Sequence, residues 1–95
     1  GSGTYTGMYF GYINDLISKT AVYPLQARRM GWEGQVLLSF TILQDGSVTD
    51  VVVVKSSGFK VLDDSARAAV KKLPRLPPPP ETVKLSIPVT YRLQT

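Results

Sequence analysis

The chain of 95 residues contains no cysteine and no histidine. These two absences exclude disulfides, thiolate nucleophiles, imidazole bases and the commonest zinc ligands, and with them most hydrolase and metalloenzyme designs. The remaining catalytic candidates are Ser56 or Ser57 beside Lys55, and the adjacent carboxylates Asp63 and Asp64. Neighbouring strand residues point to opposite faces, so Lys55 does not serve Ser56, and acidic residues that open a helix complement its dipole. We therefore expect no enzymatic activity, no catalytic residue, no metal and no cofactor.

The sequence also lacks a run of about 18 apolar residues and a signal-peptide pattern, so it predicts no membrane span in this piece. Eleven basic residues and seven acidic ones give a net charge of +4, and the basic residues are spread from Lys19 to Arg92. Only Arg28-Arg29 and Lys71-Lys72 are adjacent basic pairs. This indicates a mildly basic surface and no nucleic-acid-binding tract.

The length and a hydrophobic share of 43% predict one domain with a modest core. The opening Gly1-Ser2-Gly3 looks like a cloning scar. We expect residues 1–5 to form a disordered lead and residues 6–95 to form the domain.

Two helices are predicted before the first strand. Apolar residues at three- and four-residue spacing predict a helix from Met8 to Ser18, with Thr6 as its N-cap. Pro24 to Met30 is predicted as a short second helix, because proline suits a first helical position and Gly31 suits a helix end.

A hairpin, a long helix and a last strand follow. Alternating apolar residues from Val36 to Ile42 and a β-branched run from Val48 to Val54 flank the turn pair Asp45-Gly46. Because Val51 to Val54 are consecutive, periodicity does not say which face of the second strand is buried. Leu62 to Leu73 has helical spacing and ends at Pro74, the prolines from Pro77 to Pro80 form a stiff extended connector, and Val83 to Leu93 alternates cleanly as a strand.

This order of elements predicts an α+β fold with a three-stranded antiparallel sheet packed against two main helices. The last strand returns beside the first by a right-handed crossover, so the strand order is second, first, third. Pro88 lacks a backbone N–H, which places its strand at a sheet edge with that position facing away from the paired neighbour.

Two features of this fold could bind a partner. The unpaired edge of the last strand is either a protected edge or a site where an extended peptide adds as a further strand. The group Tyr23, Pro24, Arg28 and Arg29 is either a secondary contact surface or only the start of a helix followed by solvent-exposed charges.

The order and spacing of many small motifs resemble the C-terminal domain of the TonB energy transducers, over roughly Tyr23 to Leu93. The residues that carry this resemblance are Tyr23-Pro24, Ala27, Gly31, Glu33-Gly34-Gln35-Val36, Phe40, Asp45-Gly46-Ser47-Val48, Ser56-Ser57-Gly58, Leu62-Asp63, Ala66, Ala69-Val70 and Leu76-Pro77.

The resemblance implies a periplasmic domain of a protein anchored in the inner membrane, where an ExbB/ExbD-type motor uses the proton-motive force. It implies binding of the TonB box of outer-membrane receptors for siderophores, metal complexes or cobalamin by strand addition. On this sequence the partner-binding edge comprises Lys84, Leu85, Ser86, Ile87, Val89, Thr90, Tyr91 and Arg92.

Three other functional hypotheses stay open. A TolA-like envelope interaction domain has a similar architecture. A basic module that binds an anionic polymer or lipid would lose affinity as salt is added. Two copies of the chain could also pair edge to edge as a homodimer through the last strand.

Overall fold

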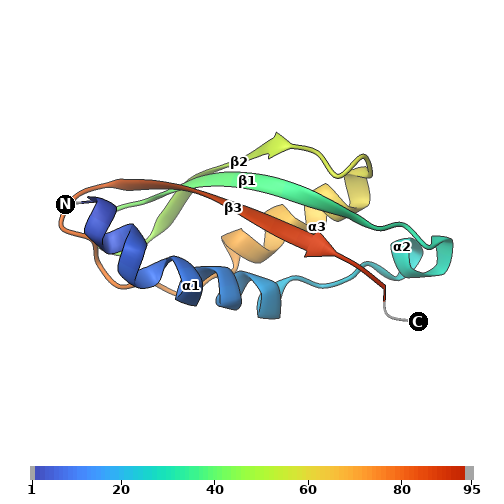
Figure 1. Cartoon of the computed structure of the whole chain (residues 1–95), viewed down its shortest axis with the longest axis horizontal. Helices are drawn as coiled ribbons and strands as arrows, with labels where there is room; N and C mark the ends of the chain where they lie inside the picture. The colour runs from blue at the N-terminus through green and yellow to red at the C-terminus, as the bar shows by residue number, and fades with distance from the viewer. Residues whose placement is uncertain (1, 94–95) are drawn as a thin grey trace.

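The structure is a computed structural model that describes residues 2–93, so Gly1, Gln94 and Thr95 lie outside the described residues. The elements follow in the order α1 (Ser2–Thr20), α2 (Leu25–Met30), β1 (Gly34–Ile42), β2 (Val48–Lys55), α3 (Lys60–Lys71) and β3 (Val83–Tyr91) (Figure 1). The three strands form one sheet in the order β2-β1-β3, and β1 is antiparallel to both neighbours. The predicted fold class and strand order are confirmed.

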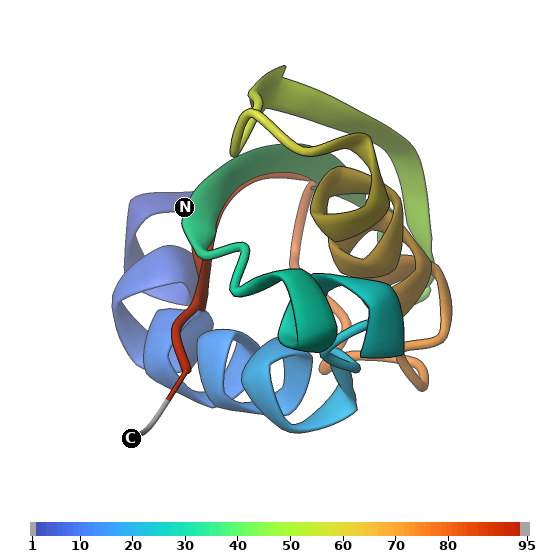
Figure 2. The same ribbon diagram turned by 90° about the vertical axis from the view of Figure 1, so that its right-hand side faces the viewer.

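The two long helices cover one face of the sheet. Figure 2 shows the sheet curving over them, with α1 on the side of β3 and α3 on the side of β2. Strand β1 sends the side chains of Val36, Leu38, Phe40 and Ile42 into this layer, where they are fully buried. No helix within residues 2–93 covers the other face of the sheet, on which alternate residues of β3 are exposed.

The predicted start of the first helix is wrong. Helix α1 begins at Ser2, not after Thr6, and the predicted disordered lead is helical from Ser2 to Tyr5. The Tyr5 side chain is 4% exposed, and its hydroxyl donates a hydrogen bond of 2.6 Å to the carbonyl of Pro77. Three glycines in the first half of α1 weaken helix propensity, and burial of Tyr5, Ile13 and Ile17 in the core opposes that cost. The cloning-scar interpretation of the first residues stays a prediction.

The second helix differs from its prediction by one residue. Pro24 is the N-cap residue of α2 and has ψ of 139°, so the helix proper starts at Leu25. Gly31 ends it with φ of 72°, which is the left-handed conformation that glycine adopts without steric cost.

Strand β2 is irregular, which resolves the face that periodicity left open. The pairing of β1 with β2 shifts register twice, and Asp50 has φ of 55° at the first of these bulges along β2. Val52 and Val54 are 54% and 57% exposed on the open face, whereas Val51 and Val53 pack against the core.

The proline-rich connector is fixed at the hairpin end of the sheet. The Leu76 N–H donates to the carbonyl of Gly46 at 2.9 Å, and Arg75 lies 3.3 Å from the carboxylate of Asp45. Leu76 is buried, so the connector forms part of the core. Among the residues that the structure describes, no helix has the length and hydropathy of a membrane span.

Candidate partner-binding edge

Strand β3 is an edge strand because β1 pairs with it on one side only. Its side chains alternate strictly between buried and exposed over Val83–Tyr91. The side chains of Leu85, Ile87, Val89 and Tyr91 are buried in the core. The predicted edge residues therefore divide: these four support the strand from inside, and only Lys84, Ser86, Thr90 and Arg92 are exposed beside the free edge.

Backbone orientation along β3 follows from a hydrogen bond in the hairpin. The Leu43 N–H donates to the Ser47 carbonyl at 2.9 Å, so odd-numbered residues of β1 direct their N–H and C=O groups toward β2. Leu37 is such a residue, and it is the register partner of Pro88. Directly opposed antiparallel residues share one orientation, so the backbone of Pro88 faces the free edge.

The same parity applies to the rest of β3. The even-numbered residues Lys84, Ser86, Pro88 and Thr90 present their backbone groups outward, whereas the odd-numbered residues bond to β1. The Leu93 N–H, two residues beyond Tyr91, points inward to the carboxylate of Glu33 at 2.5 Å, which agrees with this parity. Outward C=O groups are thus available at four positions and outward N–H groups at three of them.

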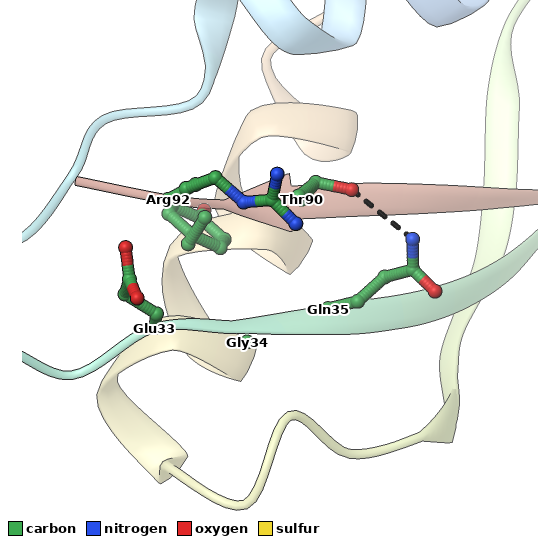
Figure 3. A pocket seen from close by; sticks show the side chains of 6 residues that line it. Glu33, Gly34, Gln35, Thr90 and Arg92 are labelled. Carbon is green, nitrogen blue, oxygen red and sulfur yellow. Dashed lines mark hydrogen bonds between the residues drawn. The ribbon is translucent and has the colours of Figure 1, made fainter. Parts of the chain in front are cut away.

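The C-terminal end of the edge adjoins a cleft of about 370 Å³ (Figure 3). Its lining residues are Glu33, Gly34, Gln35, Thr90, Tyr91 and Arg92. The amide of Gln35 donates to the hydroxyl of Thr90 at 3.1 Å, and the side chains of Glu33 and Arg92 stand near them. The sequence prediction missed Glu33 and Gln35 as neighbours of the edge, because only the strand register brings them beside Thr90 and Arg92. None of the ion pairs among residues 2–93 involves Arg92 or Lys84, so both cations flanking the edge are free of an acidic partner there.

A chain of hydrogen bonds anchors the end of β3. The Tyr91 hydroxyl donates to Ser65 on α3 at 3.0 Å, and the Ser65 hydroxyl donates to the carbonyl of Val22. Burial raises the pKa of Tyr91, and the Ser65 hydrogen bond opposes that rise in part. The ring of Tyr23 packs edge-on against Tyr91 with centroids 5.3 Å apart. These contacts join the end of β3 to α3 and to the segment between α1 and α2.

The predicted secondary contact surface also divides. The Tyr23 hydroxyl donates to the carbonyl of Trp32, and burial together with the charge of Glu33 raises the pKa of Tyr23. Pro24 is half-buried at the start of α2. Only Arg28 and Arg29 are exposed, on the short helix near the end of β3 (Figure 1). Tyr23 and Pro24 are partly buried and thus support the fold, whereas the two arginines are the exposed members of this group.

The serine candidates and Asp63 form a hydrogen-bonded cluster at the start of α3. Asp63 accepts hydrogen bonds from the Ser56 hydroxyl, from the Ser57 hydroxyl at 2.8 Å and from the Ser57 N–H at 2.9 Å. Burial raises the pKa of Asp63, but these hydrogen bonds outweigh it and leave the pKa below its usual value. Asp63 lies in the first turn of α3, so the cluster ties the end of β2 to the start of that helix. Within residues 2–93 no group of three acidic side chains is placed to hold a metal ion.

Residues 19–93 match the sequence model of the Gram-negative bacterial TonB protein C-terminal domain. The chain belongs to this family. It is 48% identical over 83 residues to the TonB protein of Helicobacter pylori, which aligns with 86% of this chain and 30% of the relative. It is 40% identical over 75 residues to the tonB2 protein of Pseudomonas aeruginosa, with 75% of this chain and 28% of that protein aligned. The chain thus spans under a third of the length of these relatives.

Two solved structures share the fold described above. The solution structure of a Helicobacter pylori TonB C-terminal domain superposes with a TM-score of 0.84 at 44% identity, covering 93% of this chain and 83% of that one. The structure of the HasB C-terminal domain gives a TM-score of 0.57 at 29% identity and covers 92% of this chain and 71% of that one. The family predicted from the sequence motifs is confirmed.

Proposed function

We propose that this TonB-type domain binds the TonB box of outer-membrane receptors by adding that segment as a strand to the free edge of β3. One observation carries the proposal: β3 presents outward backbone groups at Lys84, Ser86, Pro88 and Thr90 on a strand whose other side is fully paired. Backbone pairing binds extended segments of varied sequence, because the hydrogen bonds do not depend on side chains.

The structure supports transmission of force at this edge. Alternate side chains of β3 are buried in the core, and Tyr91 is bonded through Ser65 to the segment between α1 and α2. A strand added at the edge would be pulled against several backbone hydrogen bonds at once. We propose that the parent protein is anchored in the inner membrane with an ExbB/ExbD-type motor, and that this domain acts in the periplasm in uptake of siderophores, metal complexes or cobalamin.

The test is a titration of the ¹⁵N-labelled domain with a synthetic TonB-box peptide, followed by NMR at low and moderate salt. We expect shifts at the outward amides of Lys84, Ser86 and Thr90 that are insensitive to salt. The same peptide N-methylated at alternate amides is the control, because it cannot pair its backbone. Salt-sensitive shifts around Arg28, Arg29 and Lys71 without changes in β3 would instead support an anionic polymer or lipid as the partner.

A matched pair of variants tests the backbone contact itself. Thr90→Pro removes one outward N–H, and we expect it to weaken peptide binding about two- to tenfold. Thr90→Val loses the same hydroxyl and its bond to Gln35 but keeps the N–H, so it should bind as the unmodified domain does. Equal affinity of the two variants would contradict strand addition at this position.

A further inference from the structure

Pro88 lies in the middle of the free edge and interrupts its row of donors. The outward positions of β3 are Lys84, Ser86, Pro88 and Thr90, and Pro88 alone among them has no N–H. An uninterrupted edge offers a donor at every second residue, about 7 Å apart, whereas the gap between the N–H groups of Ser86 and Thr90 is about 13 Å. The carbonyl of Pro88 still faces outward and can accept.

This interruption affects two kinds of partner unequally. A strand from another protein brings a complete backbone, so its ladder with β3 loses only the one bond that Pro88 cannot donate. A second copy of this chain, paired edge to edge by a two-fold axis, brings its own Pro88. Whatever the register, each copy then lacks one donor, and a ladder that includes both prolines loses two bonds.

The positive charges along β3 also disfavour pairing with a second copy of the chain. In the two-fold pairing centred on Ile87, Lys84 of one copy lies opposite Thr90 of the second copy and diagonal to its Arg92. This arrangement occurs twice by symmetry and brings like charges together at both ends of the ladder. Neither cation forms an ion pair within residues 2–93.

We infer that Pro88 makes the β3 edge selective for an extended segment of another protein over a second copy of this chain. Proline and lysine on an edge are recognised means of preventing edge-to-edge association. The proline removes two hydrogen bonds from a self-paired ladder and one from a ladder with a foreign strand. The edge therefore remains able to bind a foreign strand. The part of this inference that concerns the foreign strand rests on the proposed function, and the part that concerns self-pairing does not.

The test is the Pro88→Val variant, which restores the missing N–H at an exposed position. Ser86→Val is the matched control, because it adds the same side chain to the same face without changing the backbone donors. Sedimentation over a concentration series measures self-association, and the NMR titration measures affinity for the TonB-box peptide. Dispersed amide spectra establish that each variant is folded.

We expect Pro88→Val to tighten self-association about 4- to 100-fold and peptide binding about two- to tenfold relative to Ser86→Val, because two bonds and one bond are restored respectively. Adding Lys84→Glu should tighten self-association further by pairing the new carboxylate with Arg92 of the second copy. If the double variant self-associates no more than Ser86→Val, the inference is overturned.

The two proposals fail in distinguishable ways. If the unmodified domain binds no peptide at β3 but Pro88→Val self-associates, the proposed strand addition of the receptor segment is wrong. The inference that Pro88 limits self-pairing at this edge then still stands. If the peptide binds at β3 and Pro88→Val changes neither measurement, the proposed function stands and the role of Pro88 is wrong.

Discussion

Gly46 lies where the hairpin turn meets the proline-rich connector. Its φ is 87°, and a Cβ at this position would lie 2.1 Å from the carbonyl oxygen of Leu76. Because a left-handed residue with a side chain is strained and the clash is with backbone, we expect Gly46→Ala to lower the free energy of unfolding by about 2–4 kcal/mol. Urea denaturation measures this change.

Gly58→Ala is the matched control for that prediction. Gly58 has φ of 96°, but nothing lies within 4 Å of a Cβ built on it. Only the backbone strain applies, so the loss should be about 1–2 kcal/mol. An equal loss of stability in both variants would show that the clash between the new Cβ and the Leu76 carbonyl adds nothing to the backbone strain.

Asp63 gives the domain a predictable response to acid. Hydrogen bonds from Ser56 and Ser57 hold its folded-state pKa below its usual value in spite of burial. A lowered carboxyl pKa stabilises the fold fully above the unfolded-state pKa, near 4, and this contribution is lost as pH falls through the folded-state value. We expect Asp63→Asn to lower stability at neutral pH by about 1 kcal/mol and to reduce the loss of stability below pH 4.

Denaturation curves from pH 7 to pH 2 measure both effects. Asp64→Asn is the control, since that carboxylate is exposed and its one ion pair within residues 2–93 is with Lys60 at 3.9 Å. Its stability should change by less than about 0.5 kcal/mol. A residual acid slope in Asp63→Asn is expected, because hydrogen bonds from Ser47 and the nearby Arg75 lower the pKa of Asp45 as well. An unchanged slope would mean that the hydrogen bonds from Ser56 and Ser57 to Asp63 are not coupled to its protonation.

At the scale of the elements, the sequence predicts best where one face is buried throughout. The alternation from Val83 to Tyr91 is predicted correctly, because period-2 burial has no competing interpretation. Strand β2 is not predictable in this way, since four consecutive valines carry no period and the bulge at Asp50 changes which side chains face the core.

Half of the candidate site follows from the sequence and half does not. The sequence places Lys84, Ser86 and Thr90 on one face, and proline chemistry places Pro88 at an edge. The outward direction of the backbone depends on the hairpin bond of Leu43, and the proximity of Gln35 to Thr90 depends on strand register. Neither is encoded in local pattern, because both are set by pairing between distant segments.

Helix α1 lies mostly before the segment that matches the family, which begins at residue 19, yet it completes the core beneath β3. Ile13 and Ile17 are fully buried, whereas Tyr12 on the same helix is 51% exposed. We expect Ile17→Ala to destabilise the domain by about 2–5 kcal/mol through the cavity that it leaves. Tyr12→Ala, the control, should cost under about 1 kcal/mol. Thermal denaturation distinguishes them, and equal losses would mean that α1 packs only loosely.

The whole molecule is elongated along its strands, with extents of 44, 23 and 19 Å. Its radius of gyration of 13.7 Å exceeds the roughly 12 Å expected of a compact domain of this length. The free edge of β3 runs along the long direction (Figure 1), so an added strand would lie beside most of the molecule. One continuous hydrophobic cluster nonetheless joins α1, α3 and all three strands.

A single cluster predicts a single cooperative unfolding transition, even at the end of the molecule formed by α2. Trp32 reports on that end: its ring stacks on Phe59 at 4.9 Å, and its carbonyl accepts the hydroxyl of Tyr23. Tyr23 packs in turn on Tyr91 of β3, which couples the tryptophan to the edge strand. We expect the fluorescence of Trp32 and the far-ultraviolet circular dichroism to report the same midpoint in urea. If Trp32 responds at a lower concentration, the α2 end unfolds first, and a strand pulled at Thr90 would act on a weaker anchor than the core provides.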